Sequence, residues 1–163
     1  MDTLLVCSKS TRSYLNNYTK VKIVSSAPDI KILEELGSEK NVVAIGGGAV
    51  IDTAKIICKN SIVCYPTTAA GSSATSWSVY WDGNDKHSIK RLMPKEIKYE
   101  KKFVENLSDN VIMSTTCDVI SHCIDSLSSI KATSRQDFPK TYVLNGSLYL
   151  ATREFLFKNN KFI

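Results

Sequence analysis

The sequence lacks the features of a membrane or secreted protein. No apolar run approaches the roughly 18 residues that a membrane-spanning helix needs. The first apolar run, residues 3–7, has no basic leader before it and no cleavage signal after it. The five cysteines form no CxxC pair and are odd in number, which favours reduced thiols over a disulfide framework. We therefore expect a cytoplasmic chain with no membrane partner.

Acidic residues are in deficit, because 21 lysines and arginines face 16 aspartates and glutamates, for a net charge of +5. Many of the lysines lie between residues 86 and 102. A basic stretch can bind nucleic acid or a phosphorylated ligand. This one is interrupted by Pro94, Glu96 and Glu100 and carries no nucleic-acid motif. We interpret it as a solvated loop and face, and we expect no nucleic-acid partner.

Short apolar runs alternate with helical patterns in the first part of the chain. Such alternation predicts an α/β fold with an open, mostly parallel sheet, and the continuous apolar character of the runs fits strands that are covered on both faces. The expected strands are residues 3–7, 21–25, 42–45 and 61–65, and the expected helices between them are residues 28–36 and 52–59.

From about residue 110 the pattern becomes all-helical. Apolar residues recur at helical spacing in residues 111–129 and again in residues 142–157. Ser108 or Asp109 can cap the first of these helices. We therefore expect a nucleotide-binding α/β domain over residues 1–108 and the start of an all-helical domain over residues 109–163.

Three successive glycines, Gly46, Gly47 and Gly48, follow the third expected strand and precede a helix. Glycines let a ligand approach the backbone closely and adopt positive φ at little cost, and the positive end of a helix favours a pyrophosphate. Asp52 and Lys55 follow on the expected helix, where Lys55 can neutralise a phosphate. A plain tight turn is the competing interpretation, but the flanking strand and Asp-x-x-Lys favour a nucleotide site. The GxGxxG fingerprint is absent.

A second loop follows the fourth expected strand and is rich in hydroxyl groups. Its residues Thr67, Thr68 and Ser73 can offer donors to a ribose, a nicotinamide amide or a phosphate. A surface loop without a ligand is an equally good interpretation of these residues alone. Its position favours a ligand-binding role, because ligands of such sheets bind beyond the carboxyl ends of the strands.

Asp118 and His122 are spaced i, i+4 on an expected helix, so they share one face. A carboxylate and an imidazole make half of a site for Zn²⁺ or Fe²⁺. Spacing alone favours a hydrogen bond on the helix surface, and two ligands are too few for a catalytic metal.

Three motifs, taken together and in order, resemble the iron-containing (group III) alcohol dehydrogenases. The segment from Gly46 to Lys55 is similar to their GGGSxxDxAK motif, and residues 66–69 resemble the start of their PTTAGTGSE loop. Residues 114–125 are similar to their TGxDALTHAIEA helix. The dehydroquinate synthase and glycerol dehydrogenase branches share this architecture. His122, four residues after Asp118, favours the alcohol dehydrogenase branch.

The resemblance implies roles for the residues already named. The glycines and Lys55 would lie along the pyrophosphate of NAD(P), and Thr67 and Thr68 would contact the nicotinamide side. Asp118 and His122 would be the first two ligands of Fe²⁺ or Zn²⁺. The implied reaction is hydride transfer between the nicotinamide and a small alcohol or aldehyde.

The sequence departs from the family at several positions. Ala49 stands in place of the motif's serine, and in residues 70–74 only Ser73 carries over. No acidic residue follows the first strand, whereas Lys9 and Arg12 do, which favours NADP over NAD.

The metal site shows the largest departure. The family's two later metal histidines have no counterpart, because His87 and His122 are the only histidines, and we expect His87 in a loop. Whether the chain is an enzyme is therefore left open. It could be a truncated form, one part of a split enzyme, or a non-catalytic module that binds a nucleotide or a partner. Apolar faces left uncovered would favour a homodimer or a complex with a chain that supplies the missing helices.

Overall fold

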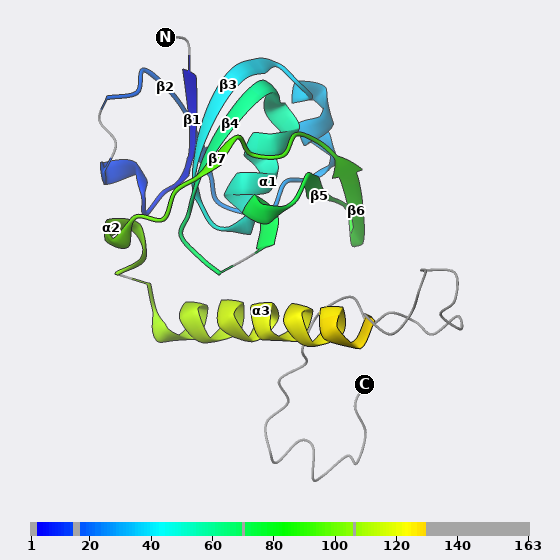
Figure 1. The fold of residues 1–163 in the computed structure, drawn as a ribbon. Helices are drawn as coiled ribbons and strands as arrows, with labels where there is room; N and C mark the ends of the chain where they lie inside the picture. The colour runs from blue at the N-terminus through cyan, green and yellow to red at the C-terminus, as the bar shows by residue number, and fades with distance from the viewer. Residues whose placement is uncertain (1–2, 15–16, 70, 106, 130–163) are drawn as a thin grey trace. The chain divides into compact units, whose positions relative to one another are not determined.

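The computed structural model describes residues 3–14, 17–69, 71–105 and 107–129, with only the main chain of residues 14 and 122–129 (Figure 1). The chain divides into two compact units, Met1–Ile112 and Met113–Ile163, and each is described by itself. The first unit holds a parallel sheet of order β2-β1-β3-β4-β7. Its strands are β1 (Thr3–Ser8), β2 (Lys20–Val24), β3 (Glu39–Gly46), β4 (Cys58–Pro66) and β7 (Glu96–Ile97).

The predicted parallel α/β sheet is thus confirmed, and its two faces bury different residues of the same strands. Side chains alternate between faces along a strand, so Leu4 and Val6 of β1 join the larger core cluster, while Leu5 and Cys7 join the smaller one. Helix α1 (Gly48–Ile57) covers the first face, as Figure 1 shows, and Phe103 packs on the second. Burial on both faces explains why the strands read as continuous apolar runs.

Two of the expected helices differ from prediction. Residues 30–35 form the 3₁₀ helix η2 (Ile30–Glu35) instead of an α-helix, after Asp29 accepts a hydrogen bond from the Lys31 N–H at 2.9 Å. Helix α1 begins at Gly48, four residues earlier than the expected start at Asp52, and ends at Ile57. All residues from Val50 to Ile57 are buried, so a single amphipathic stripe could not mark where this helix begins.

The first part of the basic stretch expected as a solvated loop and face, residues 86–90, is mostly exposed but lies on strand β6 (Asp85–Lys90), which pairs with β5 (Trp77–Asp82) in a hairpin. Gly83 adopts φ 58° in its turn, a conformation that favours glycine. His87, which was expected in a loop, lies on β6 with its ring stacked on Tyr80 at a centroid distance of 5.4 Å. Tyr80 and Ile89 are partly buried against the larger core cluster, so one face of the hairpin is partly covered despite its polar sequence.

The remaining elements are short turns and one long helix. They are η1 (Arg12–Tyr14), η3 (Gly71–Ala74), α2 (Lys101–Val104) and α3 (Asp109–Ser129). Helix α3 confirms the helix predicted over residues 111–129, and the Ser108 carbonyl accepts hydrogen bonds from Val111 and Ile112 at its start. The helix predicted over residues 142–157 lies outside the described residues. Within the described part of the chain, no helix is long and apolar enough to cross a membrane.

Candidate functional site

The strand order places a topological switch point between β1 and β3. Strand β2, which follows β1 in the chain, pairs with one side of β1. The next strand, β3, pairs with the opposite side of β1. In open parallel sheets, ligands bind outside the carboxyl ends of the two strands at such a point. Here those ends are Ser8 and Gly46, so the glycine turn borders the crevice.

The glycine turn has no Cβ atoms, so neighbouring side chains approach its backbone closely. A Cβ on Gly46 would lie 2.5 Å from Val50 Cγ2, so only glycine allows α1 to pack this tightly against the end of β3. Gly47 is the N-cap of α1 with φ −79°, and no side chain caps the helix there. Among the described glycines only Gly37 and Gly83 have positive φ, so the turn does not use the conformational freedom that we expected of it.

The hydroxyl-rich loop after β4 lies directly beside the glycine turn. The Thr67 N–H donates to the Gly46 carbonyl at 3.1 Å, and a Cβ on Gly47 would lie 3.2 Å from Thr68 Oγ1. Thr67 and Ser73 are buried, whereas Thr68 is half-buried. The structure therefore brings the glycine turn and Thr67 and Thr68 together. Of the two threonines, Thr68 is the more exposed.

The Ser8–Arg12 segment lies beside the end of β3, close to the glycine turn. Thr11 is buried and donates through Oγ1 to the Ile45 carbonyl at 3.2 Å, which ties the segment to β3. Sequence reasoning gave Thr11 no part in the site, since a single threonine in a loop carries no signal of burial. Lys9 is exposed and Arg12 is half-buried in the same segment.

Lys55 occupies a different place from the one its sequence position suggested. It is the eighth residue of α1, which puts it roughly 10 Å along the helix axis from Gly48. Its side chain is fully buried. Its Nζ donates to the carbonyls of Ser72 at 2.8 Å, Thr75 at 3.4 Å and also Trp77. The ammonium group therefore holds the segment after the hydroxyl-rich loop against α1.

Asp52 supplies the counter-charge to this buried ammonium group. Its Oδ1 atom lies 3.4 Å from Lys55 Nζ, one helical turn away on α1. Burial raises the pKa of the Asp52 carboxyl, and the Lys55 charge acts in the opposite direction. Burial likewise lowers the pKa of the Lys55 ammonium, opposed by Asp52. Such a pair holds its geometry well, because separating the two charges would leave one of them buried alone.

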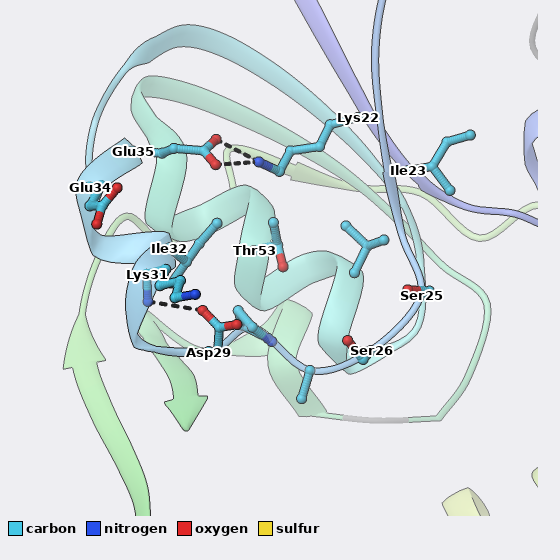
Figure 2. Close-up of a pocket in the computed structure, with 13 residues that line it drawn as sticks. Lys22, Ile23, Ser25, Ser26, Asp29, Lys31, Ile32, Glu34, Glu35 and Thr53 are labelled. Carbon is cyan, nitrogen blue, oxygen red and sulfur yellow. Dashed lines mark hydrogen bonds and ion pairs between the residues drawn. The ribbon is translucent and has the colours of Figure 1, made fainter. Parts of the chain in front are cut away.

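A cavity of about 340 Å³ lies between β2, η2 and Thr53 of α1 (Figure 2). Two of its charged side chains, Lys22 and Glu35, are engaged with each other. Figure 2 shows Lys22 Nζ bonded to both carboxylate oxygens of Glu35, at 2.5 and 2.6 Å. Asp29 serves as the N-cap of η2. We therefore assign this cavity no ligand.

The expected metal ligands both lie on α3. Asp118 is half-buried, and the side chain of His122 is outside the described residues. Among the residues that the structure describes, no group of three histidine, cysteine or acidic side chains could hold a metal ion. The described side chains therefore do not form a metal site.

Comparison with known proteins agrees with this geometry. No family model matches the chain. It is 35% identical over 102 residues to the maleylacetate reductase of Pseudomonas knackmussii, a match that covers 59% of this chain and 29% of that protein. The iron-containing alcohol dehydrogenase of Corynebacterium glutamicum superposes with a TM-score of 0.65. This chain has the fold of the iron-containing alcohol dehydrogenases.

That likeness covers 77% of this chain and 40% of the solved structure, at 24% identity. The maleylacetate reductase of a Rhizobium species superposes with a TM-score of 0.66 at 18% identity, over 85% of this chain and 44% of its own. The resemblance predicted from the three motifs is confirmed. The chain spans 29% of the length of the curated relatives that it matches.

Proposed function

We propose that this chain binds a nicotinamide dinucleotide in the crevice at the ends of β1 and β3. One observation carries the proposal: the bare backbone of Gly47 and the Thr68 hydroxyl lie side by side at the N-terminus of α1. The uncapped N–H groups of the first helical turn favour the pyrophosphate. Thr67 and Thr68 face the nicotinamide side. Lys55 holds the loop that presents them through its bond to the Ser72 carbonyl, and Ser73 is buried in that loop.

The activity that fits this site is that of an NAD(P)-dependent alcohol dehydrogenase or aldehyde reductase. The bound dinucleotide supplies or accepts the hydride. Asp118 and His122 would contribute two ligands to Fe²⁺ or Zn²⁺, and further ligands would have to come from outside the described residues. We also propose that the chain works in the cytoplasm, as a homodimer or with a chain that supplies further helices. Light scattering tests that association, and a monomer would count against it.

Titration of the chain with NADP⁺ and NAD⁺ by calorimetry tests nucleotide binding. Gly47→Ala places a methyl group 3.2 Å from Thr68 Oγ1 and is expected to weaken binding by about tenfold. Gly71→Ala is the matched control, because a Cβ there meets nothing within 4 Å. Absence of binding by the unmodified chain, or equal binding by the Gly47 variant, would contradict the proposal.

Lys9 and Arg12 favour NADP through its 2′-phosphate. Both follow the end of β1, where an acidic residue would instead bond the ribose of NAD. Lys9→Gln is expected to weaken NADP⁺ binding and to leave NAD⁺ binding unchanged. Equal losses of affinity for NADP⁺ and NAD⁺ would show that Lys9 does not interact with the 2′-phosphate.

A non-catalytic nucleotide-binding module is the second candidate. It is favoured by the lack of a three-ligand metal group among the described residues. Oxidation of NADPH in the presence of small aldehydes, with Fe²⁺ or Zn²⁺ added, separates the two functions. Nucleotide binding without turnover under all these conditions would favour the module.

A further inference from the structure

A second pocket, of about 560 Å³, opens at the opposite edge of the sheet from the glycine turn. In a parallel sheet all strands begin at one edge, and this pocket lies where β3 and β4 begin and where α1 ends at Ile57. It is lined by Leu36, Gly37, Lys59, Lys90, Arg91 and Leu92. The pocket is therefore separate from the proposed dinucleotide crevice.

The charge of this pocket is entirely positive. Lys59 comes from the start of β4, Lys90 from the end of β6 and Arg91 from the residue that follows it, and no carboxylate lines the space. Within the described residues, neither Lys59 nor Lys90 forms an ion pair or a side-chain hydrogen bond. Three cations that converge without a counter-charge repel one another, and an anion between them relieves that repulsion.

Arg91 is held rigidly at the pocket wall. Its Nε donates to the Lys55 carbonyl at 3.2 Å, and its Nη2 donates to the Cys58 carbonyl at 2.9 Å. These bonds satisfy carbonyls at the C-terminal end of α1, so the guanidinium offsets the negative end of the helix dipole that would otherwise repel an anion. Its Nη1 makes no hydrogen bond with any described residue and is left for a ligand.

Gly37 leaves space beside this guanidinium group. Its φ of 65° lies in the left-handed region, and a Cβ there would stand 3.7 Å from Arg91 Nη2. The Gly37 N–H donates to the Ile56 carbonyl at 3.1 Å, which fixes the turn against the end of α1. The floor of the pocket is thus built from main-chain bonds, while the two lysines stand at its rim.

We propose that this pocket binds a multivalent oxyanion of the phosphate class. Arginine matches the geometry of phosphate oxygens, and the lysines act as point charges that add affinity without fixing orientation. The size of the space suits an anion larger than a single phosphate. The proposal does not depend on dinucleotide binding at the other edge of the sheet.

Calorimetric titration with inorganic pyrophosphate tests this site. The unmodified chain should bind pyrophosphate, and the double variant Lys59→Gln, Lys90→Gln should bind it about tenfold more weakly. The control Lys86→Gln, Lys95→Gln removes the same charge from exposed lysines outside the pocket and should bind normally. Arg91 is left intact because its loss would also free the end of α1.

Three results would overturn the proposal. The unmodified chain could fail to bind pyrophosphate at low salt. Both double variants could lose affinity equally, which would show an effect of net charge alone. Finally, Gly47→Ala could abolish pyrophosphate binding while the Lys59, Lys90 variant retains it, which would place the anion at the glycine turn. Circular dichroism of each variant checks that it is folded.

Discussion

The ammonium group of Lys55 donates to the main-chain carbonyl of Ser72 at 2.8 Å, and this bond joins the last turn of α1 to the loop beside the glycine turn. Further bonds to Thr75 and Trp77 extend the same connection to the start of β5. The sequence predicted that the positive charge of Lys55 neutralises a phosphate. In the structure the same ammonium group fixes the conformation of the loop. Lys55 would therefore act on a ligand at the glycine turn only indirectly, by fixing the loop that the ligand contacts.

Replacing Lys55 with methionine should be strongly destabilising. The change leaves Asp52 as a buried charge without its partner and removes the donor to three carbonyls, so we expect a loss of about 3 kcal/mol in the free energy of unfolding. Urea denaturation followed by circular dichroism measures it. Lys98→Met is the matched control, because Lys98 pairs with Glu96 at 3.3 Å where both side chains are exposed to solvent, and it should destabilise the chain far less than Lys55→Met. Equal effects in the two variants would contradict the role given to Lys55.

Gly46→Ala should destabilise the chain by overpacking. The new methyl group would lie 2.5 Å from Val50 Cγ2, so α1 or β3 must shift, at a cost of about 1–3 kcal/mol. Val50→Ala in the same chain removes both Cγ atoms, at 2.5 and 3.0 Å, but keeps Cβ at 2.7 Å, so it relieves the clash in part. The double variant should therefore lose less stability than the sum of the single variants, which urea denaturation of all four proteins can establish. Simple additivity would show that the two residues are not in contact.

Alkaline pH should lower the stability of the fold through Cys64. Burial raises the pKa of this thiol to about 12, well above the ordinary range of a cysteine, and the nearby Lys55 charge opposes the shift. The native chain keeps the proton over that range while the unfolded chain releases it, so stability falls as the pH rises from 9 towards 12. The slope from this group is about 1.4 kcal/mol per pH unit. Cys64→Ala should have a correspondingly shallower slope in urea titrations, and an unchanged slope would contradict the assignment.

The thiols should differ in their reaction with a disulfide reagent. Cys7, Cys58 and Cys64 are free and buried, and burial raises the pKa of each, whereas Cys117 is half-buried. In a Cys123→Ser background, Cys117 should react first and the other three only at the rate of unfolding. Peptide mass spectrometry after short labelling distinguishes them. Rapid labelling of Cys64 in the folded chain would be inconsistent with its position on β4.

Much of the sheet was predictable because its residues are covered on both faces. Runs such as residues 42–45 contain little but β-branched and small apolar side chains, a pattern with few alternatives to a buried parallel strand. The hairpin β5–β6 was not predicted, because it buries one face only and its second strand is rich in charge. The Asp82-Gly83 pair at its turn was the available signal.

Part of the candidate site could also be predicted. The glycine turn and the threonine loop were assigned from sequence, and the structure places them in contact. The burial of the Lys55 side chain could not be predicted from sequence, since a lysine on an expected helix gives no sign that its ammonium group is buried. Arg91 carries no motif at all, and its bonds to the end of α1 arise only once β6 folds back on the helix.

The hairpin has a practical consequence. Both tryptophans of the chain, Trp77 and Trp81, lie on β5, and they are 53% and 37% exposed. Trp77 is also the residue whose carbonyl accepts a hydrogen bond from Lys55. The tryptophan fluorescence of the unmodified protein therefore comes from one strand, which gives a built-in optical probe of the loop that Lys55 anchors.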